Sequence, residues 1–340
     1  MNNDILLKIE NLFVSFSTYA GKVQAVRGAN LVIHKGEIVA VVGESGCGKS
    51  VMAQSILQLN PSPPCTIDQG SILFQNEDLL QMNQRSIRKI RGKHIGIIFQ
   101  DPMTSLDPTK QIGYQIIEGI RRHESIPKQK AYNKAADMLC SVGIANPVAR
   151  MKQYPHEFSG GMRQRVMIAS SLVCNPELLI ADEPTTALDV TIQAQILDLL
   201  LKMQIETKTS IMLITHDMGV VADVADRVNI MYAGIILESG LINEIFYDAK
   251  HPYTWGLLNS IPTPQRRSER LVPIEGSPPD LLNPPVGCPF AERCDYAMRV
   301  CYEQMPEVSH ISDDHQVLCW LMHPDAPTVV RPMPEERGDA

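Results

Sequence analysis

The chain has 340 residues, a mass of 37.8 kDa and a formal net charge of −7, from 31 basic and 38 acidic side chains. Its 44% hydrophobic and 20% charged residues are typical of globular proteins, and its length leaves room for about two domains. The acidic balance argues against a general polyanion-binding surface. Because no apolar run is long enough to span a membrane and no signal peptide is recognisable, a cytoplasmic protein is expected.

Prolines and cysteines divide the chain near residue 250. Of the 24 prolines, 14 lie between Pro252 and Pro334, and four of the eight cysteines group in the same region. Long regular elements are not expected in so proline-rich a segment. We therefore expect a main domain over residues 5–245, an extension over 246–325 and a flexible tail over 326–340.

Short apolar runs predict an α/β fold for the main domain. They are rich in aliphatic and β-branched residues and alternate with amphipathic stretches, a pattern typical of a parallel sheet covered by helices. The predicted strands are Leu7–Val14, Ile38–Val42, Ile95–Phe99, Leu178–Ala181 and Ile211–Thr215.

Two regions have helical periodicity. After Asp189, apolar side chains recur at helical spacing and form one stripe, which we expect to face the sheet. Two further helical stripes follow one another between about 104 and 158, with no strand between them. The sequence therefore predicts an all-helical subdomain over residues 104–165. Aliphatic runs return from about 228 to 246.

A glycine-rich loop follows the strand predicted at 38–42. Residues 43–50 read Gly-Glu-Ser-Gly-Cys-Gly-Lys-Ser and fit the pattern G-x-x-x-x-G-K-[ST]. Its glycines allow successive backbone N–H groups to surround phosphate oxygens, and the following helix adds the positive end of its dipole. We expect Lys49 to reach the β- and γ-phosphates and Ser50 to ligate Mg²⁺. The alternative is a turn that only closes a strand–helix unit.

Two carboxylates follow the strand predicted at 178–181. Asp182 is placed to hold Mg²⁺, since hard cations prefer carboxylate oxygens. Glu183 is placed to orient or deprotonate an attacking water. Read alone, an acidic pair at a strand end also fits a helix cap or a solvated turn. The upstream phosphate loop favours the functional interpretation.

Polar side chains also follow two other predicted strands. Gln100 offers an amide that can ligate Mg²⁺ or sense the γ-phosphate, and His216 offers a neutral imidazole for the γ-phosphate and the water. Either residue, read alone, is equally consistent with a structural role. Their assignment depends on a family resemblance.

Residues 158–165, Phe-Ser-Gly-Gly-Met-Arg-Gln-Arg, resemble the L-S-G-G-Q signature of ATP-binding-cassette ATPases. They lie between the phosphate loop and the carboxylate strand, as in that family. Gln100, the Ala187-Leu188-Asp189 segment and His216 also keep the family's order. Of the two departures, phenylalanine for leucine keeps an apolar anchor, whereas Met162 for glutamine removes side-chain hydrogen bonds.

The resemblance implies a P-loop ATPase cassette with a mixed sheet core and a helical subdomain. It implies catalytic roles for Glu183 and His216. It also implies a head-to-tail dimer in which Ser159 and its neighbours bind ATP held by the other subunit's phosphate loop. The residues assigned to ATP are Phe16, Tyr19, Gly43, Glu44, Ser45, Gly46, Cys47, Gly48, Lys49, Ser50, Val51, Gln100, Ser159, Gly160, Gly161, Met162 and Asp182, with Ser50, Gln100 and Asp182 as Mg²⁺ ligands.

An aromatic ring is expected to stack on the adenine. Phe16 and Tyr19 are available in the loop expected after the first strand, and the spacing favours Phe16. The alternative for an aromatic at this position is packing under the sheet.

The extension resembles that of the ATPases that energise bacterial dipeptide and oligopeptide importers, a group that includes nickel-complex importers. It opens with His251-Pro252-Tyr253-Thr254, and the first ATPase subunit type is the better match. The resemblance then covers about residues 5–325. It implies a second, non-identical ATPase, two membrane permeases and an extracytoplasmic peptide-binding protein as partners, no nucleic acid, and a peripheral position on the cytoplasmic face of the membrane.

Four cysteines of the extension supply soft sulfur ligands within 32 residues. Cys288, Cys294, Cys301 and Cys319 lack the short C-x2–4-C spacing that zinc sites favour, whereas iron–sulfur clusters accept wider spacing. The resemblance also favours a [4Fe–4S] cluster with a structural role. Zinc and no metal are the alternatives.

The leading hypothesis is thus an ATPase that drives peptide import by closing and reopening a nucleotide-binding dimer. Import of a nickel complex is the alternative within the same family. A soluble cassette ATPase acting on ribosomes or DNA is less favoured, because the chain has one cassette, no heptad run and an acidic charge. A binding subunit with a dead site is disfavoured because every catalytic landmark is present.

Overall fold

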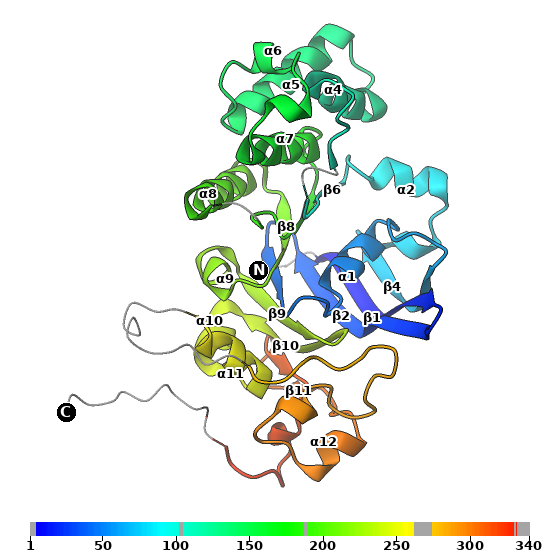
Figure 1. Ribbon diagram of the computed structural model, residues 1–340, viewed down its shortest axis with the longest axis vertical. Coiled ribbons are helices and arrows are strands. Elements are labelled where there is room, and N and C mark those ends of the chain that lie inside the picture. Colours follow the sequence, from blue (N-terminus) through cyan, green and yellow to red (C-terminus); the bar gives the residue numbers. More distant parts are fainter. Residues whose placement is uncertain (1–4, 102–104, 187–188, 262–273, 330, 332–340) are drawn as a thin grey trace, which may run out of the picture.

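The computed structural model describes residues 5–101, 105–186, 189–261, 274–329 and 331. Figure 1 shows a helical lobe at one end, two sheets in the middle and the C-terminal extension at the other end. The predicted Ala187-Leu188 pair and most of residues 326–340 lie outside the described residues.

An eight-stranded mixed sheet forms the centre of the fold, in the order β11-β12-β10-β9-β3-β8-β7-β6. The five strands from β9 to β6 are parallel, and β10, β12 and β11 add antiparallel pairs. The bounds are β3 Ile38–Val42, β6 Ile95–Ile98, β7 Leu178–Asp182, β8 Ser210–Thr215, β9 Arg227–Tyr232, β10 Ile235–Leu241, β11 Ser309–His310 and β12 Gln316–Val317. The mixed-sheet α/β fold and its four predicted parallel strands are confirmed, with end shifts of one residue.

A second, antiparallel sheet lies beside the first, in the order β2-β1-β4-β5. Its strands are β1 Ile5–Thr18, β2 Gly21–His34, β4 Cys65–Phe74 and β5 Glu77–Asp78. Only part of β1 was predicted, over 7–14. The strand continues to Thr18 through several register shifts, which interrupt the alternation of buried and exposed residues.

The predicted all-helical segment is present between β6 and β7 and forms the lobe at the top of Figure 1. Its apolar stripes pack together with α8 in one core cluster. Its elements are α4 Ile112–His123, α5 Lys128–Ser141, α6 Pro147–Arg150, η2 Pro155–Glu157 and α7 Gly160–Leu172.

The remaining helices of the main domain flank the sheets. The stripe predicted after Asp189 is confirmed: Ile196, Leu199, Leu200 and Met203 of α8 are all buried. The elements are α1 Lys49–Ile56, η1 Leu79–Gln81, α2 Gln84–Ile90, α8 Val190–Thr207, α9 Met218–Val224 and α10 Ile242–Asp248. Among the described residues, no helix has both the length and the apolar character to cross a membrane.

In its described residues the extension contains short elements and no long helix or strand, as its proline content predicts. They are α11 Pro252–Asn259, η4 Ala291–Arg293, α12 Arg299–Glu303, β11, β12 and η5 Trp320–Met322. The extension packs on the main domain, because β12 pairs with β10 and a core cluster mixes side chains from both. Tyr232 and Val228 of the sheet share this cluster with Tyr253, Trp255 and Phe290.

Candidate nucleotide site

The glycine-rich loop runs from the end of β3 to the start of α1. Gly46 and Gly48 have positive φ angles of 77° and 102°, which favour glycine. A Cβ on Gly48 would lie 2.3 Å from the carbonyl oxygen of Ala25, and one on Gly43 would lie 2.0 Å from that of Met231. Backbone from β2 and β9 therefore closes around the loop: Gly43 is required by space, Gly46 by its conformation and Gly48 by both.

Lys49 is the first residue of α1 and is only 5% exposed. Its Nζ donates hydrogen bonds to the carbonyl oxygens of Gly43 at 2.7 Å and of Glu44 at 2.9 Å. The ammonium is thus fixed at the mouth of the loop, above the N-terminus of α1. Both features favour an anion at this point.

Ser50 and Asp182 meet although 132 positions separate them. The Ser50 hydroxyl donates to Asp182 Oδ1 at 3.0 Å, and Asp182, the last residue of β7, is 2% exposed. Burial raises the pKa of Asp182, and the neighbouring Glu183 charge adds to the increase, against the hydrogen bond from Ser50. A hydroxyl and a buried carboxylate at this spacing are suitable ligands for Mg²⁺.

Glu183 has the densest polar surroundings of the site. Gln100 Nε2 and Thr186 Oγ1 each donate to Glu183 Oε2 at 2.9 Å, and His216 Nδ1 lies 3.4 Å from Oε1. Burial alone would raise the pKa of Glu183, but the Thr186 hydrogen bond and the His216 charge hold it below its ordinary value. Glu183 also has a left-handed φ of 45°, a strained conformation of the kind that concentrates at functional sites.

The signature segment begins α7 in the helical lobe. Ser159 is the N-cap residue, and its hydroxyl accepts from the Met162 N–H at 3.4 Å. Phe158 is buried, as expected of an apolar anchor. A Cβ on Gly160 would have no neighbour within 4 Å among the described residues, whereas one on Gly161 would lie 3.0 Å from Ile192 Cγ2. The start of α7 is therefore open on the side of Gly160.

The structure gathers the phosphate loop with Asp182, Glu183, Gln100 and His216, but it leaves the signature apart. Figure 1 shows α7 in the helical lobe and α1 beside the lower sheets. Within one chain the two segments do not form a single binding site.

The two candidate aromatics differ in their surroundings. Phe16 lies inside β1, where it pairs with Val23 and Cys65 and packs in part against the core cluster around α1. The expectation that Phe16 lies in a loop was therefore wrong, because β1 continues to Thr18. Tyr19 lies in the β1–β2 turn and is fully exposed.

The four cysteines of the extension do lie near one another. The Cys288 N–H donates to the Cys301 carbonyl oxygen at 2.8 Å, and burial raises the pKa of Cys288 and Cys319 to about 12, with further increases from the neighbouring thiols. However, no group of three or more His, Cys, Asp or Glu side chains in the described part of the chain is arranged to hold a metal ion.

The expected [4Fe–4S] cluster, and zinc as its alternative, are therefore not supported. Cys288 and Cys294 instead pack at the border of the apolar cluster that joins the extension to the sheet. The prediction rested on the grouping and spacing of the cysteines and on the family resemblance, and it gave the cluster the role of holding the proline-rich segment together. The shared core supplies that cohesion, because Tyr253, Trp255 and Phe290 are buried against β9 and β10.

Several contacts at the site escaped the sequence analysis. Thr186 binds Glu183, and the buried Gln164 of α7 donates to the Pro184 carbonyl, which ties the signature helix to the carboxylate loop. The available signal for Thr186 was its hydroxyl, which lies three positions after Glu183 in the Pro184-Thr185-Thr186 turn. Arg293 of the extension binds Glu44 of the phosphate loop, and no local pattern indicates so distant a pair.

Two family models match the chain. The model described as "ABC transporter" matches residues 26–186, which include the phosphate loop, the signature and Asp182. The model described as "Oligopeptide/dipeptide transporter, C-terminal region" matches residues 237–301, which include most of β10, all of α11 and three of the four cysteines.

Curated relatives match over nearly the whole chain. The oligopeptide transport ATP-binding protein OppD of Bacillus subtilis (strain 168) is 56% identical over 328 residues, which cover 96% of this chain and 92% of the relative. The dipeptide transport ATP-binding protein DppD of the same organism is 54% identical and covers 93% of this chain and 94% of the relative.

Solved structures match the main domain. A dimeric ATP-binding cassette in a post-hydrolysis state, bound to ADP and Pi, is 26% identical with a TM-score of 0.63, and covers 69% of this chain and 98% of its own. The protein cbiO1 of Clostridium perfringens, part of the ABC transporter complex cbiONQ, is 31% identical with a TM-score of 0.61. The match covers 72% of this chain and 92% of cbiO1. By these matches and by its own site, the chain belongs to the ABC-transporter ATPases, in the branch that carries the oligopeptide/dipeptide transporter C-terminal region.

Proposed function

We propose that this chain is the ATP-hydrolysing subunit of an importer for dipeptides or oligopeptides. One observation carries the proposal. A complete set of nucleotide-site residues and the oligopeptide/dipeptide C-terminal region occur in one chain, whose peptide-transport relatives match it almost from end to end.

The proposed chemistry assigns each polar group of the site a role. The phosphate-loop N–H groups and Lys49 bind the β- and γ-phosphates, and Ser50, Asp182 and Gln100 are the Mg²⁺ ligands. The Mg²⁺ ion neutralises charge on the phosphate oxygens when it is bound. Glu183 accepts a proton from the attacking water, and its lowered pKa keeps it ionised for that task at neutral pH.

His216 and Thr186 complete this assignment by orienting Glu183. His216 Nδ1 lies 3.4 Å from one carboxylate oxygen and Thr186 donates to the other, so the carboxylate is held from both sides. The other ring nitrogen of His216, Nε2, would then be available to the γ-phosphate. For the adenine, the exposed Tyr19 fits a stacking role better than the half-buried Phe16.

A second chain would complete the site. The open face at Gly160 and the N-terminus of α7 suit the γ-phosphate of an ATP molecule held by another subunit. ATP binding would then close the dimer, and hydrolysis would reopen it. The dimeric state of the solved cassette with ADP and Pi supports this arrangement.

The partners follow from the importer role. We propose a second, non-identical ATPase, two membrane permeases and an extracytoplasmic peptide-binding protein, with this chain on the cytoplasmic face of the membrane. The relatives named for oligopeptide and dipeptide transport support peptides over a nickel complex as the substrate.

The test is affinity purification of the tagged full-length chain from gently solubilised membranes. We expect permease subunits to co-purify, and reconstituted ATPase activity to rise when the binding protein is loaded with peptide. Stimulation by a nickel chelate and not by peptide would show that the substrate is a nickel complex. Co-purification with ribosomes or DNA, without any permease, would refute the importer role.

A further inference from the structure

A bidentate ion pair joins the C-terminal extension to the phosphate loop. Arg293 Nη1 donates to Glu44 Oε2 at 2.7 Å, and Nη2 donates to Glu44 Oε1 at 2.9 Å, across 249 positions of sequence. The Arg293 side chain is 5% exposed and that of Glu44 is 26% exposed. A bidentate pair so well shielded from water is both strong and directional.

All five N–H donors of Arg293 have acceptors. Besides the two bonds to Glu44, Nη1 donates to the Tyr232 hydroxyl at 3.1 Å, Nη2 to the Ile274 carbonyl at 3.0 Å and Nε to the Glu275 carbonyl at 2.8 Å. Burial alone would lower the pKa of Arg293, but the bonds to Glu44 and Tyr232 raise it further than burial lowers it. The guanidinium is therefore charged and held in one orientation.

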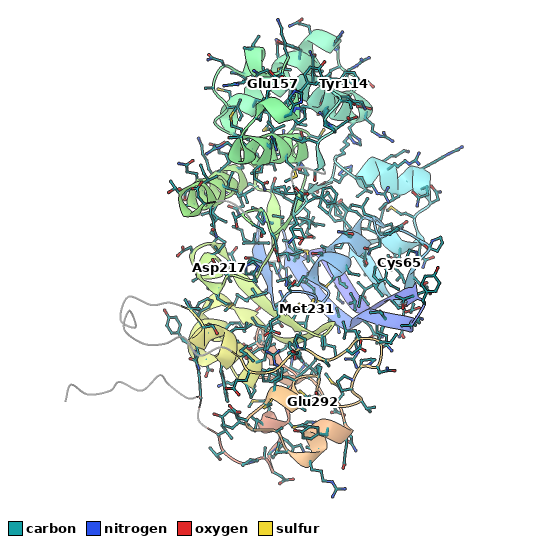
Figure 2. All side chains as sticks on the ribbon, in the orientation of Figure 1. Cys65, Tyr114, Glu157, Asp217, Met231 and Glu292 are labelled. Carbon is teal, nitrogen blue, oxygen red and sulfur yellow. The ribbon has the colours of Figure 1, made fainter. Side chains whose placement is uncertain are left out.

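The backbone of Glu44 is held by the extension as well. Its N–H donates to the hydroxyl oxygen of Tyr253, a fully buried residue of α11, at 3.0 Å. The Tyr253 ring lies 4.6 Å from that of Tyr232 and 5.2 Å from that of Phe290. Figure 2 labels Met231, which precedes Tyr232 in β9, and Glu292, which precedes Arg293 in the extension.

Glu44 connects these contacts to the phosphate-binding lysine. Its carbonyl oxygen accepts from Lys49 Nζ at 2.9 Å, so the side chain, the N–H and the carbonyl of one loop residue are all fixed. A loop that is already ordered loses less conformational entropy when it binds a ligand. The contacts from the extension thus act on the same residue that positions the lysine.

We propose that Arg293 is a positioning residue for the phosphate loop, and that it couples nucleotide affinity to the C-terminal extension through Glu44. The simpler alternative is that the pair only attaches the extension to the main domain. Other contacts already provide that attachment: buried Glu238 of β10 accepts from the backbone N–H groups of Lys250 and His251 and lies 2.9 Å from His315 Nε2. The pair at Glu44 is therefore not needed for attachment alone.

The test is the dissociation constant of the full-length chain for the fluorescent analogue mant-ATP with Mg²⁺. For Arg293→Ala we expect an increase of about tenfold, and for Glu44→Gln an increase in the same direction. The double variant should bind no more weakly than the weaker single variant, since both changes break one interaction. Arg299→Ala is the matched control, because Arg299 is exposed and its ion pair within the described residues is with Glu303, four residues on.

Steady-state ATPase kinetics distinguish positioning from a structural role. Arg293→Ala should raise KM while kcat stays within about twofold, because the residue shapes the loop and does not touch the reacting atoms. A variant that melts at a lower temperature yet binds mant-ATP as tightly as the unaltered chain would overturn the proposal. Should Arg293→Ala fail to fold, Arg293→Lys with Glu44→Gln gives the same comparison, and strictly additive effects of those two changes would also overturn it.

Discussion

His216 and Glu183 come from the ends of two adjacent parallel strands, and His216 Nδ1 lies 3.4 Å from Glu183 Oε1. Because the two strands end side by side, His216 and Glu183 come into contact although 33 positions separate them in the sequence. Gln100, from the end of the next strand, binds the other carboxylate oxygen. The ends of three strands thus converge on the Glu183 carboxylate, which we propose accepts a proton from the attacking water.

The first prediction concerns this carboxylate. Glu183→Gln keeps the shape and the hydrogen-bond geometry but cannot accept a proton, so we expect ATP turnover to fall by about 100-fold or more while MgATP binding persists. The measurement is phosphate release alongside mant-ATP titration. Glu206→Gln on α8 is the control, since Glu206 is exposed and pairs only loosely with Lys202. Unchanged turnover in Glu183→Gln would remove Glu183 from the catalytic role.

The second prediction concerns the buried partner of Ser50. Because burial raises the pKa of Asp182, the ionised carboxylate is less favourable in the nucleotide-free fold than in the unfolded chain. Asp182→Asn should therefore unfold at a higher urea concentration than the unaltered chain, yet hydrolyse MgATP about 100-fold more slowly or worse, since a metal ligand is lost.

Urea titrations at pH 7.5 and phosphate-release assays check this pair of effects. Asp198→Asn is the control, because Asp198 is exposed on α8. A stabilised variant with full MgATP turnover would exclude Asp182 as a metal ligand. A destabilised variant would show that the hydrogen bond from Ser50 outweighs the cost of burying the charge.

The third prediction concerns the signature. A Cβ added to Gly160 meets no atom within 4 Å in the part of its own chain that the structure describes, and an acidic residue suits the first turn of a helix. Gly160→Asp should therefore leave folding and mant-ATP binding unchanged. It should reduce ATPase activity by about 100-fold, because a carboxylate would face the γ-phosphate held by the other subunit. Gly119→Asp, also with open space around its Cβ, is the matched control.

Size-exclusion chromatography with ATP separates the outcomes of that experiment. In the Glu183→Gln background, we expect ATP to produce a dimer that the added Gly160→Asp change abolishes. A dimer that survives Gly160→Asp would mean that the signature of one subunit does not bind the nucleotide of another.

Much of the fold followed from local pattern. All five residues of Ile38–Val42 are buried, and a short aliphatic run of this kind predicts a strand covered on both faces. Of the antiparallel sheet, only residues 7–14 of β1 were predicted. Register shifts near Leu12 and Val14 interrupt the alternation of buried and exposed residues, so no clean pattern continues along β1 to Thr18.

The site divides in the same way. Lys49, Ser50, Asp182 and Glu183 lie in motifs whose spacing carries the chemistry, so the sequence indicated them. The contact of Arg293 with Glu44 spans 249 positions and depends on how the extension packs, which no spacing records. The four cysteines show the opposite error: their grouping is real, but nearness in sequence does not establish a ligand geometry.

The last prediction concerns His251, which opens the extension. His251 is 1% exposed, its Nδ1 accepts from the Tyr253 N–H, and its Nε2 has no hydrogen-bond partner among the residues that the structure describes. Burial lowers the pKa of His251 to about 4, against a small opposing effect of Glu238. Below about pH 6.5 the unfolded chain therefore binds a proton that the folded chain does not, and stability falls as the pH drops from 6.5 towards 4.

Between pH 7 and pH 5 this difference costs about 2 kcal/mol of the free energy of unfolding. His251→Asn keeps an N-cap acceptor but has no proton to bind, so its stability should vary less with pH by that amount. Urea titrations at the two pH values measure the difference, with exposed His323→Asn as the control. The burial of one neutral imidazole predicts both the sign and the size of this pH dependence. Equal pH dependence in the unaltered chain and in His251→Asn would therefore show that other groups cause the acid sensitivity.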